Sequence, residues 1–359
     1  MTSQRGRRRR RGTIEHIAVT AAIALSGLTG CTSADISEHI SQSPAWHKRA
    51  KSDTGCLNYR EGTISYVSEN KMSLFDARTG VRKWISDDLG KDSGCPLYTP
   101  TGVYYGLGTN TVAALNPVTG KNLWKKRYDD FLDYATLRPY ASNGDIHFLV
   151  NNSIITIDPK TRKESWRHTE QEDMWIVNMA TAGDMVIATT ANGKVRGISA
   201  ADGKVAWTYT TPTHARINQV PTVAGDTVYV GSYDAHIYAL STTNGKLKWK
   251  TKLEAGTDWN PVTTHDTLLI VDNYNFNGID IRNGHRKWTV DYHDPADAIS
   301  NGQHLIYCNE KEKRFYGINP DNGERIWQLN IKEKLMHWSL GKNMLYITTR
   351  TQLNAYKLP

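Results

Sequence analysis

The 359-residue sequence lacks the short motifs by which many metal proteins and enzymes are recognised. Its twelve histidines and four cysteines form no His-x-His, Cys-x-x-Cys or His-Glu-x-x-His spacing, so no metal site is predicted. No glycine-rich loop opens a helix to hold a phosphate, and no Ser-His-Asp set stands out. We therefore name no catalytic residue and no metal ligand, and we expect a protein that is not an enzyme.

Beyond the N-terminus the sequence also lacks a strong excess of charge. The formal net charge is +8, but residues 1–30 contribute +5 of it, which leaves +3 for the rest. Binding to nucleic acid usually requires a much stronger basic surface. We therefore expect no nucleic-acid partner.

The first thirty residues resemble an export signal. Arginines at six positions between residues 5 and 11 precede an apolar run at 17–28 that is too short to span a membrane as a mature helix. The run ends in Leu-Thr-Gly before Cys31, which resembles the bacterial lipobox, where the cysteine receives a lipid. This order of features favours a lipoprotein signal peptide with lipidation at Cys31. A plain secretory peptide with an incidental cysteine is the alternative.

The residues after Cys31 divide into a tether and a folded domain. Residues 31–44 are mostly small and polar, which predicts a flexible tether with little fixed structure. If Cys31 carries more than one acyl chain, the lipid holds the protein at a membrane without a transmembrane helix. Residues 45–359 are predicted to form one domain, because they are organised by a single repeat.

The repeat consists of a five-residue turn followed, four residues after its last position, by a tryptophan. Each turn begins with Asp, Asn or Ser and ends in glycine, except that one ends in Arg162. The tryptophans recur at intervals of 39 to 42 residues, which is the period of a four-stranded propeller blade. The seven turns are 76–80, 116–120, 158–162, 199–203, 241–245, 280–284 and 319–323. The tryptophans that follow them are Trp84, Trp124, Trp166, Trp207, Trp249, Trp288 and Trp327.

The turns and the segments before them have the chemistry of β-hairpins. The polar residue that opens a turn accepts hydrogen bonds from backbone amides, and the closing glycine adopts a positive φ. The preceding segments, such as 227–231 and 237–240, alternate apolar and polar residues and are rich in β-branched and aromatic types. No segment has a helical pattern of comparable strength.

This repeat resembles the PQQ-like, or quinoprotein-type, β-propeller repeat, in which a Thr-Gly turn is paired with a tryptophan that docks against the neighbouring blade. The resemblance covers nearly all of residues 45–359. WD-type repeats have a similar length, but the sequence contains no Trp-Asp dipeptide. Because a tryptophan that recurs in every blade serves packing between blades, we expect a structural role for all of them.

The two ends of the chain are expected to close the ring together. After Trp327 only three strands remain, at 336–340, 343–349 and 352–357. At the other end, Ala45–Lys48 looks like an isolated outer strand, and Trp46 lies 38 residues before Trp84, in phase with the series. We therefore predict an all-β fold, an eight-bladed propeller of four-stranded antiparallel blades whose last blade is completed by the N-terminal strand, which also removes an exposed sheet edge.

Alignment of the blades by their tryptophans brings one position of each inner strand to the same mouth of the channel. Aromatic residues and arginine at such a rim are common anchors of binding surfaces. The predicted binding rim consists of Tyr134, Trp175, Arg216, Trp259, Asp297 and Trp338. The alternative is that these aromatic side chains only fill the channel.

Cys56 and Cys95 occupy the two remaining positions of that alignment. Neighbouring strands near a propeller axis come within the Cα separation of roughly 4.4 to 6.8 Å that a disulfide requires. A bridge between them is therefore possible, and two buried thiols are the alternative. Cys308 aligns with Gly231 as a small buried residue.

The resemblance to quinoproteins also raises a pyrroloquinoline quinone (PQQ)-dependent dehydrogenase as an alternative function. Such enzymes bind PQQ with Ca²⁺ over the channel, and they resemble this chain in the repeats but carry long insertions and often an adjacent cysteine pair. Neither feature is present, and a period of 39 to 42 residues leaves little chain for a cofactor pocket. We expect no cofactor.

The lipobox, the short PQQ-like blades and the N-terminal strand together resemble the BamB-like lipoproteins, which act as scaffolds in outer-membrane assembly. The resemblance implies an extracytoplasmic, lipid-anchored binding protein, monomeric apart from its partners. The expected partner is an envelope or membrane protein, or a cell-envelope polymer. Thr32 after Cys31 is not the aspartate that retains Gram-negative lipoproteins in the inner membrane, so the outer membrane is the expected location in such a host. In a Gram-positive host the protein would lie on the outer face of the cell membrane.

Overall fold

The structure is a computed structural model, and its described residues begin at Glu38. They are residues 38–50, 56–90, 94–108, 110–128, 138–150, 152–171, 175–257, 259–273, 275–292 and 297–359. The predicted signal peptide and Cys31 lie outside them.

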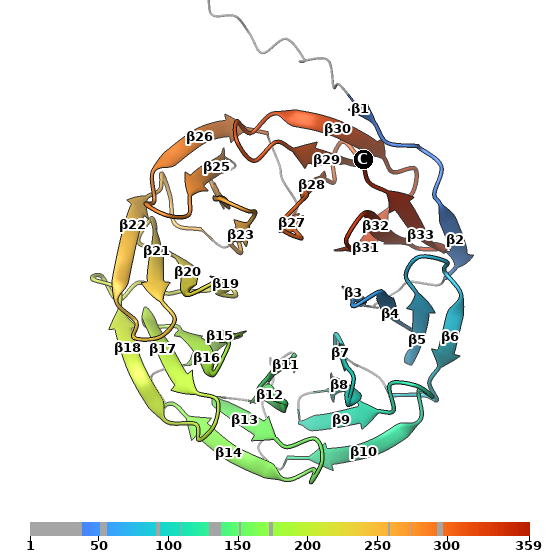
Figure 1. Ribbon diagram of the computed structural model, residues 1–359, viewed down its shortest axis with the longest axis horizontal. Helices are drawn as coiled ribbons and strands as arrows, with labels where there is room; N and C mark the ends of the chain where they lie inside the picture. The colour runs from blue at the N-terminus through green and yellow to red at the C-terminus, as the bar shows by residue number, and fades with distance from the viewer. Residues whose placement is uncertain are drawn as a thin grey trace, which may run out of the picture. The chain divides into compact units, whose positions relative to one another are not determined.

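The described residues form β-strands and turns without a helix, and the strands are grouped into eight sheets around a central axis (Figure 1). Each sheet has four antiparallel strands arranged from the axis outward, and one sheet has a fifth, parallel strand at its outer edge. This arrangement confirms the predicted eight-bladed β-propeller. No helix among these residues is long and apolar enough to cross a membrane.

Blades 1 to 4 follow one another along the chain. Blade 1 comprises β3 (Leu57–Arg60), β4 (Thr63–Ser68), β5 (Lys71–Asp76) and β6 (Arg82–Ile85). Blade 2 comprises β7 (Leu97–Thr99), β8 (Gly102–Leu107), β9 (Thr111–Leu115) and β10 (Asn122–Arg127). Blade 3 comprises β11 (Pro139–Ser142), β12 (Asp145–Val150), β13 (Ser153–Ile157) and β14 (Glu164–Thr169). Blade 4 comprises β15 (Ile176–Ala182), β16 (Met185–Thr190), β17 (Lys194–Ser199) and β18 (Val205–Thr210).

Blades 5 to 8 complete the ring. Blade 5 comprises β19 (Thr222–Ala224), β20 (Thr227–Ser232), β21 (His236–Ser241) and β22 (Leu247–Lys252). Blade 6 comprises β23 (Val262–Thr263), β24 (Thr267–Asp272), β25 (Asn275–Asp280) and β26 (Arg286–Asp291). Blade 7 comprises β27 (Asp297–Ser300), β28 (Leu305–Asn309), β29 (Arg314–Ile318) and β30 (Arg325–Asn330). Blade 8 comprises β31 (Leu335–Leu340), β32 (Met344–Thr349), β33 (Gln352–Lys357) and β2 (Trp46–Arg49).

The hydrophobic core lies between neighbouring blades, not in one central mass. The second and third strands of each blade are almost entirely buried, because both of their faces contact another blade. Between blades 2 and 3, for example, Tyr104 and Val112 pack with Ile146 and Phe148. The fourth strands are more exposed, and in β18 and β22 the tryptophan is the one buried residue.

Six of the repeated tryptophans dock in the same way on the next blade. The indole Nε1 of each donates a hydrogen bond to a backbone carbonyl in the turn of the following blade, over 2.8 to 3.1 Å. The glycine that closes that turn lies under the ring: at Gly120 (φ +70°) an added Cβ would lie 2.5 Å from Trp84. Glycine is therefore required here for both the positive φ and the space. The six are Trp46, Trp84, Trp166, Trp207, Trp249 and Trp288.

The N-terminal strand closes the ring as predicted. β2 pairs antiparallel with β33, with Trp46 opposite Ala355 and Arg49 opposite Gln352. Trp46 in turn donates to the carbonyl of Ala77 in blade 1. The last blade is thus built from both ends of the chain: β31, β32 and β33 come from the C-terminal end, and the outermost strand, β2, comes from the N-terminal end (Figure 1).

The predicted tether needs a correction at its C-terminal part. Glu38–His39 form a short strand, β1, which pairs parallel with β30 opposite Trp327 and Gln328. Ile40 is buried and packs against Trp327, whose own exposure is 1 %. Trp327 faces blade 8, which lacks the turn that covers the other tryptophans, so the N-terminal segment covers it instead. Residues from Glu38 onward, within the predicted tether of residues 31–44, therefore have fixed structure.

Antiparallel strands give each blade two ends with different connections. The link from one blade to the next and the turn between the second and third strands lie at one end, which we call the loop face. The turns between first and second strands and between third and fourth strands lie at the opposite end. The loop face carries the starts of all the innermost strands, so the predicted rim belongs to it.

Candidate binding site at the channel mouth

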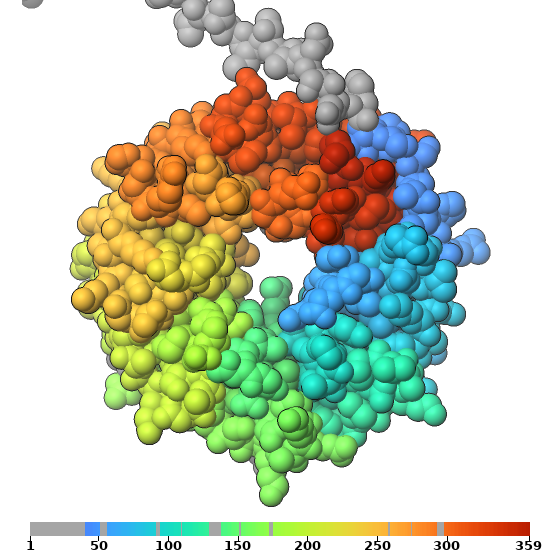
Figure 2. All heavy atoms as spheres, in the orientation of Figure 1, coloured from blue at the N-terminus to red at the C-terminus, as the bar shows by residue number. Residues whose placement is uncertain are grey.

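The innermost strands surround a central opening, which is visible through the ring in Figure 2. A cavity of about 390 Å³ lies along it, against blades 3, 5, 6 and 7. Its lining is mainly hydroxyl, amide and small apolar groups with one basic side chain. The lining residues are Arg138, Tyr140, Val220, Thr222, Asn260, Pro261, Val262, Thr263, Ala298, Ile299 and Ser300.

Asparagines hold neighbouring inner strands together near this opening. The Nδ2 of Asn58 donates to the carbonyl of Pro96 in the next blade over 3.2 Å, and that of Asn178 to a carbonyl of blade 5 over 2.8 Å. The Oδ1 of Asn260 accepts from the backbone N–H of Val220 over 2.9 Å. Such side-chain links fix the inner strands, which make few backbone contacts with one another, and so shape the mouth.

Trp175 lies on the loop face immediately before β15, with half of its surface exposed (50 %). Asn152, in the turn of blade 3 between β12 and β13, forms hydrogen bonds with the backbone on both sides of Trp175 in the sequence. The Asn152 Nδ2 donates to the carbonyls of Glu170 and Gln171 over 3.1 and 3.0 Å, and its Oδ1 accepts from the N–H of Ile176 over 2.8 Å. A large apolar side chain is therefore held in solvent by a fixed backbone.

A buried ion pair supports the same segment. Arg196 of blade 4 donates to the carboxylate of Glu170 over 2.9 Å, and the His168 Nε2 lies 3.1 Å from the same carboxylate. Burial alone would raise the pKa of Glu170, but the hydrogen bonds from His168 and Arg196 outweigh it and hold this pKa below its usual value. Glu170 is thus charged at neutral pH and joins blade 3 to blade 4.

Arg216 and Tyr233 lie next to each other in blade 5. The Tyr233 N–H donates to the carbonyl of Arg216 over 3.1 Å, which joins the link before β19 to the turn between β20 and β21. Both side chains are exposed, Tyr233 by 43 %. Gly193 (φ +76°) lets the link approach closely, because an added Cβ would lie 2.7 Å from the carbonyl oxygen of Ala215.

Trp259 continues the surface into blade 6. It is half-buried, packs against the core between blades 6 and 7, and its N–H donates to the Thr257 hydroxyl over 3.1 Å. Gly256 in the same link lies against the backbone of Tyr233. Trp175, Arg216, Tyr233 and Trp259, which we call the mouth cluster, therefore occupy the loop face of three successive blades.

The sequence matches a family model described as outer membrane protein assembly factor BamB. Two matches, at residues 68–221 and 210–337, together span about three quarters of the chain. The chain belongs to the BamB family. Its PQQ-like repeats and its propeller architecture are those of that family.

BamB of Shewanella oneidensis is 23 % identical over 324 residues, covering 76 % of this chain and 79 % of that protein. Tetrathionate hydrolase of Acidithiobacillus ferrooxidans is 24 % identical over 229 residues, covering 57 % of this chain and 46 % of that protein, so this chain spans about half the length of that relative. Among solved structures, BamB from Moraxella catarrhalis superposes with a TM-score of 0.72 at 15 % identity, covering 88 % of this chain and 97 % of that one. The structural likeness establishes the shared fold.

The predicted rim residues do not all lie in equivalent places. Trp175, Arg216 and Trp259 lie in the links of blades 4 to 6. Asp297 begins β27, opposite Cys308, and Tyr134 lies outside the described residues. Trp338 lies within β31, between blades 7 and 8, with its ring edge-on to Phe315 at 4.9 Å. Trp338 is therefore a packing residue and does not belong to the mouth cluster.

The alignment by tryptophans is wrong at the inner strands because the links between blades vary in length. Judged by pairing with the second strand, Trp338 is equivalent to Met179 in blade 4 and to Ala298 in blade 7. These residues follow the preceding tryptophan by 11, 13 and 10 positions, respectively. The period of the repeat therefore fixes the outer strands, whereas the start of each inner strand depends on its own link.

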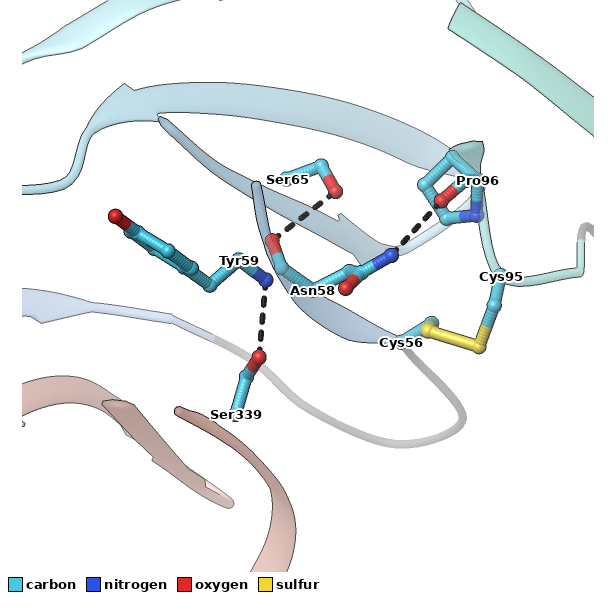
Figure 3. Close-up of a disulfide and its surroundings, with 7 residues drawn as sticks. All are labelled: Cys56, Asn58, Tyr59, Ser65, Cys95, Pro96 and Ser339. Atoms are coloured by element: carbon cyan, nitrogen blue, oxygen red, sulfur yellow. Dashed lines mark hydrogen bonds between the residues drawn. A yellow bond between two sulfur atoms is a disulfide. The ribbon is translucent and has the colours of Figure 1, made fainter. Parts of the chain in front are cut away.

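The two cysteines of the alignment are joined. The structure has a disulfide between Cys56 and Cys95, with 5.3 Å between their Cα atoms (Figure 3). It links the segments before β3 and β7 on the loop face, beside the hydrogen bond from Asn58 to Pro96. Cys308 is buried in β28.

Two residues of the site were missed by sequence reasoning. Tyr233 follows the second strand of its blade, a position that the inner-strand alignment does not include, although an aromatic residue in a tight turn is a detectable signal. Asn152 carries no signal of its own, because asparagine is common in turns. Its contacts depend on a link from the end of the same blade that folds back over it.

Proposed function

We propose that the protein is an extracytoplasmic, lipid-anchored scaffold that binds an envelope protein through the mouth cluster. The observation that carries this proposal is the exposure of Trp175, whose neighbours are held by the three hydrogen bonds of Asn152. Trp, Tyr and Arg are the residues most enriched in the energetic centres of protein interfaces. A rigid backbone lowers the entropy lost on binding.

Family membership supports the scaffold role. The relative from Shewanella oneidensis bears the name of an outer membrane protein assembly factor and is similar over most of its length. By this analogy the partner is a membrane protein of the envelope or its assembly machinery, and Arg216 offers it a charge for a carboxylate. The lipobox that ends at Cys31 supports anchoring to the cell membrane, or to the outer membrane in a Gram-negative host.

The residues described here do not fit the alternative of a PQQ-dependent dehydrogenase. Ca²⁺ is bound by carboxylate and carbonyl oxygens, yet the described lining of the channel cavity contains no carboxylate. No group of three or more His, Cys, Asp or Glu side chains that could hold a metal occurs among the described residues. The fold alone is shared with enzymes, and function depends on the site.

The test is a pull-down from detergent-solubilised envelope. We expect a membrane protein to be retained by the wild-type protein and lost with Trp175→Ala/Arg216→Ala/Tyr233→Ala. The matched control, Val81→Ser/Val118→Ser, removes two side chains with exposures of 59 % and 78 % at the opposite end of the blades and should retain the partner. An unchanged partner list for the first variant, folded by circular dichroism, would refute the mouth cluster as the binding site.

Lipid anchoring is tested separately by mass spectrometry of the N-terminal peptide of protein isolated from membranes. For the wild-type protein we expect an acylated peptide that begins at Cys31. The Cys31→Ser variant should instead accumulate as unprocessed precursor or as soluble protein without lipid. A mature protein that begins at another residue without lipid would support the plain secretory signal instead.

A further inference from the structure

The seam where the ring closes contains a second cavity, of about 420 Å³. It lies between β2 and β33 of blade 8 on one side and β4, β5 and β6 of blade 1 on the other. It is separate from the channel, which is surrounded by the innermost strands, because β2 and β6 are the outermost strands of their blades. Figure 1 shows the two strands side by side at the edge of the ring.

Four basic side chains line this seam cavity from both of its walls. Lys48 and Arg49 project from β2, Lys71 from the start of β5, and Arg82 from the start of β6. All four are exposed. Within the described part of the chain, none of these four side chains has a hydrogen bond or an ion pair.

The remaining lining supplies hydroxyl groups and one carboxylate. Ser73 and Tyr66 are buried side chains of blade 1 that contribute to the cavity wall, and Glu69 is the single acidic residue among its described lining residues. In the described lining, four cations therefore share a polar space with one negative charge. Like charges gathered across a cavity repel one another and lower the stability of the closed ring unless an anion joins them.

An equivalent junction elsewhere in the ring shows a different solution. Counted from the tryptophans, the positions of Lys48 and Arg49 are taken by Lys126 and Arg127 between blades 2 and 3, and the position of Arg82 is taken by Glu164. Between blades 2 and 3, the basic pair on one outer strand is therefore matched by the acidic Glu164 on the next outer strand. At the seam the equivalent of Glu164 is the basic Arg82, so the concentration of positive charge is not a general property of the repeat.

We propose that the seam cavity binds a ligand that carries two or more phosphate groups. Guanidinium groups bind phosphate oxygens in pairs and ammonium groups bind them as point charges. The volume corresponds to about a dozen water molecules, at roughly 30 Å³ each, which is more than one phosphate needs. The ligand joins β2 to blade 1 and so strengthens the closure of the ring. This site does not depend on the partner proposed for the mouth cluster.

The direct test is calorimetric titration of the purified protein with inorganic tripolyphosphate at low salt. Lys71→Gln/Arg82→Gln removes two of the four cations without altering a backbone pair of the sheet. We expect binding by the wild-type protein and about tenfold weaker binding by this variant, the loss expected for two charge-assisted contacts. Lys48→Gln/Arg49→Gln should weaken binding to a similar extent, because those side chains form the opposite wall.

The matched control is Lys250→Gln/Lys252→Gln, which removes two exposed lysines from β22, the outer strand of blade 5. It changes the net charge equally and should leave tripolyphosphate binding unchanged. Equal weakening by the control and by the seam variants would reveal a non-specific charge effect and overturn the proposal. Absence of tripolyphosphate binding by the wild-type protein would overturn it as well.

Thermal unfolding adds a readout that separates binding from folding. Because a ligand that binds only the folded state stabilises it, tripolyphosphate should raise the melting temperature of the wild-type and control proteins by more than that of the seam variants at the same ligand concentration. Sedimentation with phosphatidylglycerol or phosphatidylcholine vesicles then distinguishes the sources of phosphate. Weaker binding of Lys71→Gln/Arg82→Gln than wild type to the anionic vesicles alone identifies lipid headgroups. Equal vesicle binding with impaired tripolyphosphate binding identifies a soluble phosphate ligand.

Discussion

Cys56 and Cys95 join blade 1 to blade 2 by a disulfide, and they lie 39 positions apart in the sequence, on either side of the whole of blade 1. On its other side, blade 1 accepts the docking of Trp46 from the strand that closes the ring. The blade at which a propeller would otherwise open is therefore fixed covalently on one side and by the N-terminal strand on the other.

Replacement of both cysteines by serine should lower the stability of the ring. In the chain-entropy model a crosslink over a loop of this length stabilises the folded state by about 4 kcal/mol. We expect a lower midpoint of urea unfolding for Cys56→Ser/Cys95→Ser than for the wild-type protein. Treatment of the wild-type protein with a reductant is the control and should reproduce the shift. An identical midpoint for oxidised and reduced protein would contradict this role.

The stability of the protein should fall in mild acid partly because of His147. This side chain is fully buried, with Nε2 2.7 Å from the Ser142 hydroxyl and Nδ1 2.7 Å from the Thr156 hydroxyl. Burial lowers its pKa from 6.5 to about 4. The unfolded chain therefore binds a proton below pH 6.5 that the folded protein does not bind until about pH 4, and the contribution of His147 is lost across this window as pH falls.

Between pH 7 and pH 5 this single group should account for about 2 kcal/mol of the lost free energy of unfolding. His147→Gln keeps an amide that can hydrogen-bond but does not titrate. Urea unfolding at pH 7, 6 and 5 should give a smaller loss for the variant than for the wild type. Burial also lowers the pKa of His304 and His337, so the difference between the two slopes is the quantity to compare. Equal slopes would show that His147 is not responsible.

The sequence predicted those parts of the fold that depend on the repeat. The spacing of the tryptophans specifies the outer strands, because the indole ring, the turn glycine and the acceptor carbonyl must recur together. The phase of Trp46 was sufficient to predict that β2 completes blade 8. By contrast, β1 has only two residues, and it forms because Trp327 needs a cover that no turn of blade 8 provides. That requirement is visible only in three dimensions.

The candidate site was harder to predict than the fold. Residue type placed Trp175, Arg216 and Trp259 in a predicted rim whose binding role stays a prediction, and it placed Trp338 there although that side chain packs between blades. The links between blades differ in length, and their course is determined by individual contacts such as those of Asn152. A repeat period carries no information on such contacts.

Arg162 is the exception among the turns, and its replacement should stabilise the protein. It has a φ of 61° at the place where the other turns have glycine. A non-glycine residue in this conformation costs about 1 kcal/mol, of which part is offset because glycine makes the unfolded chain more flexible. We expect Arg162→Gly to raise the melting temperature by about 2 °C and to shift the fluorescence of Trp124, which would gain the glycine surface on which six of the other tryptophans dock.

Ala235→Gly is the matched control for this turn, because Ala235 also has a positive φ (59°) but lies in a turn between β20 and β21 where no repeated tryptophan docks. It should give a similar or smaller gain in melting temperature without a change in tryptophan fluorescence. A decrease in the stability of Arg162→Gly would mean that the arginine side chain makes a stabilising contact that outweighs the backbone strain.

Asn152 should determine whether the mouth cluster is presented in a fixed form. Asn152→Ala removes three hydrogen bonds to the segments on either side of Trp175, and we expect a loss of about 2 kcal/mol of stability. Hydrogen exchange of peptides that contain Ile176 should become faster, because its amide loses its acceptor. Asn110 occupies the equivalent turn of blade 2, and among the described residues its side chain accepts a hydrogen bond from neighbouring Thr111 alone. Asn110→Ala is therefore the control, and it should change neither exchange at Ile176 nor partner retention.

Asn152→Ala, by contrast, should weaken retention of the envelope partner even with the aromatic residues intact. Normal retention by a folded Asn152→Ala protein would show that the partner does not require a preformed Trp175 and would shift the binding energy to Arg216 and Tyr233.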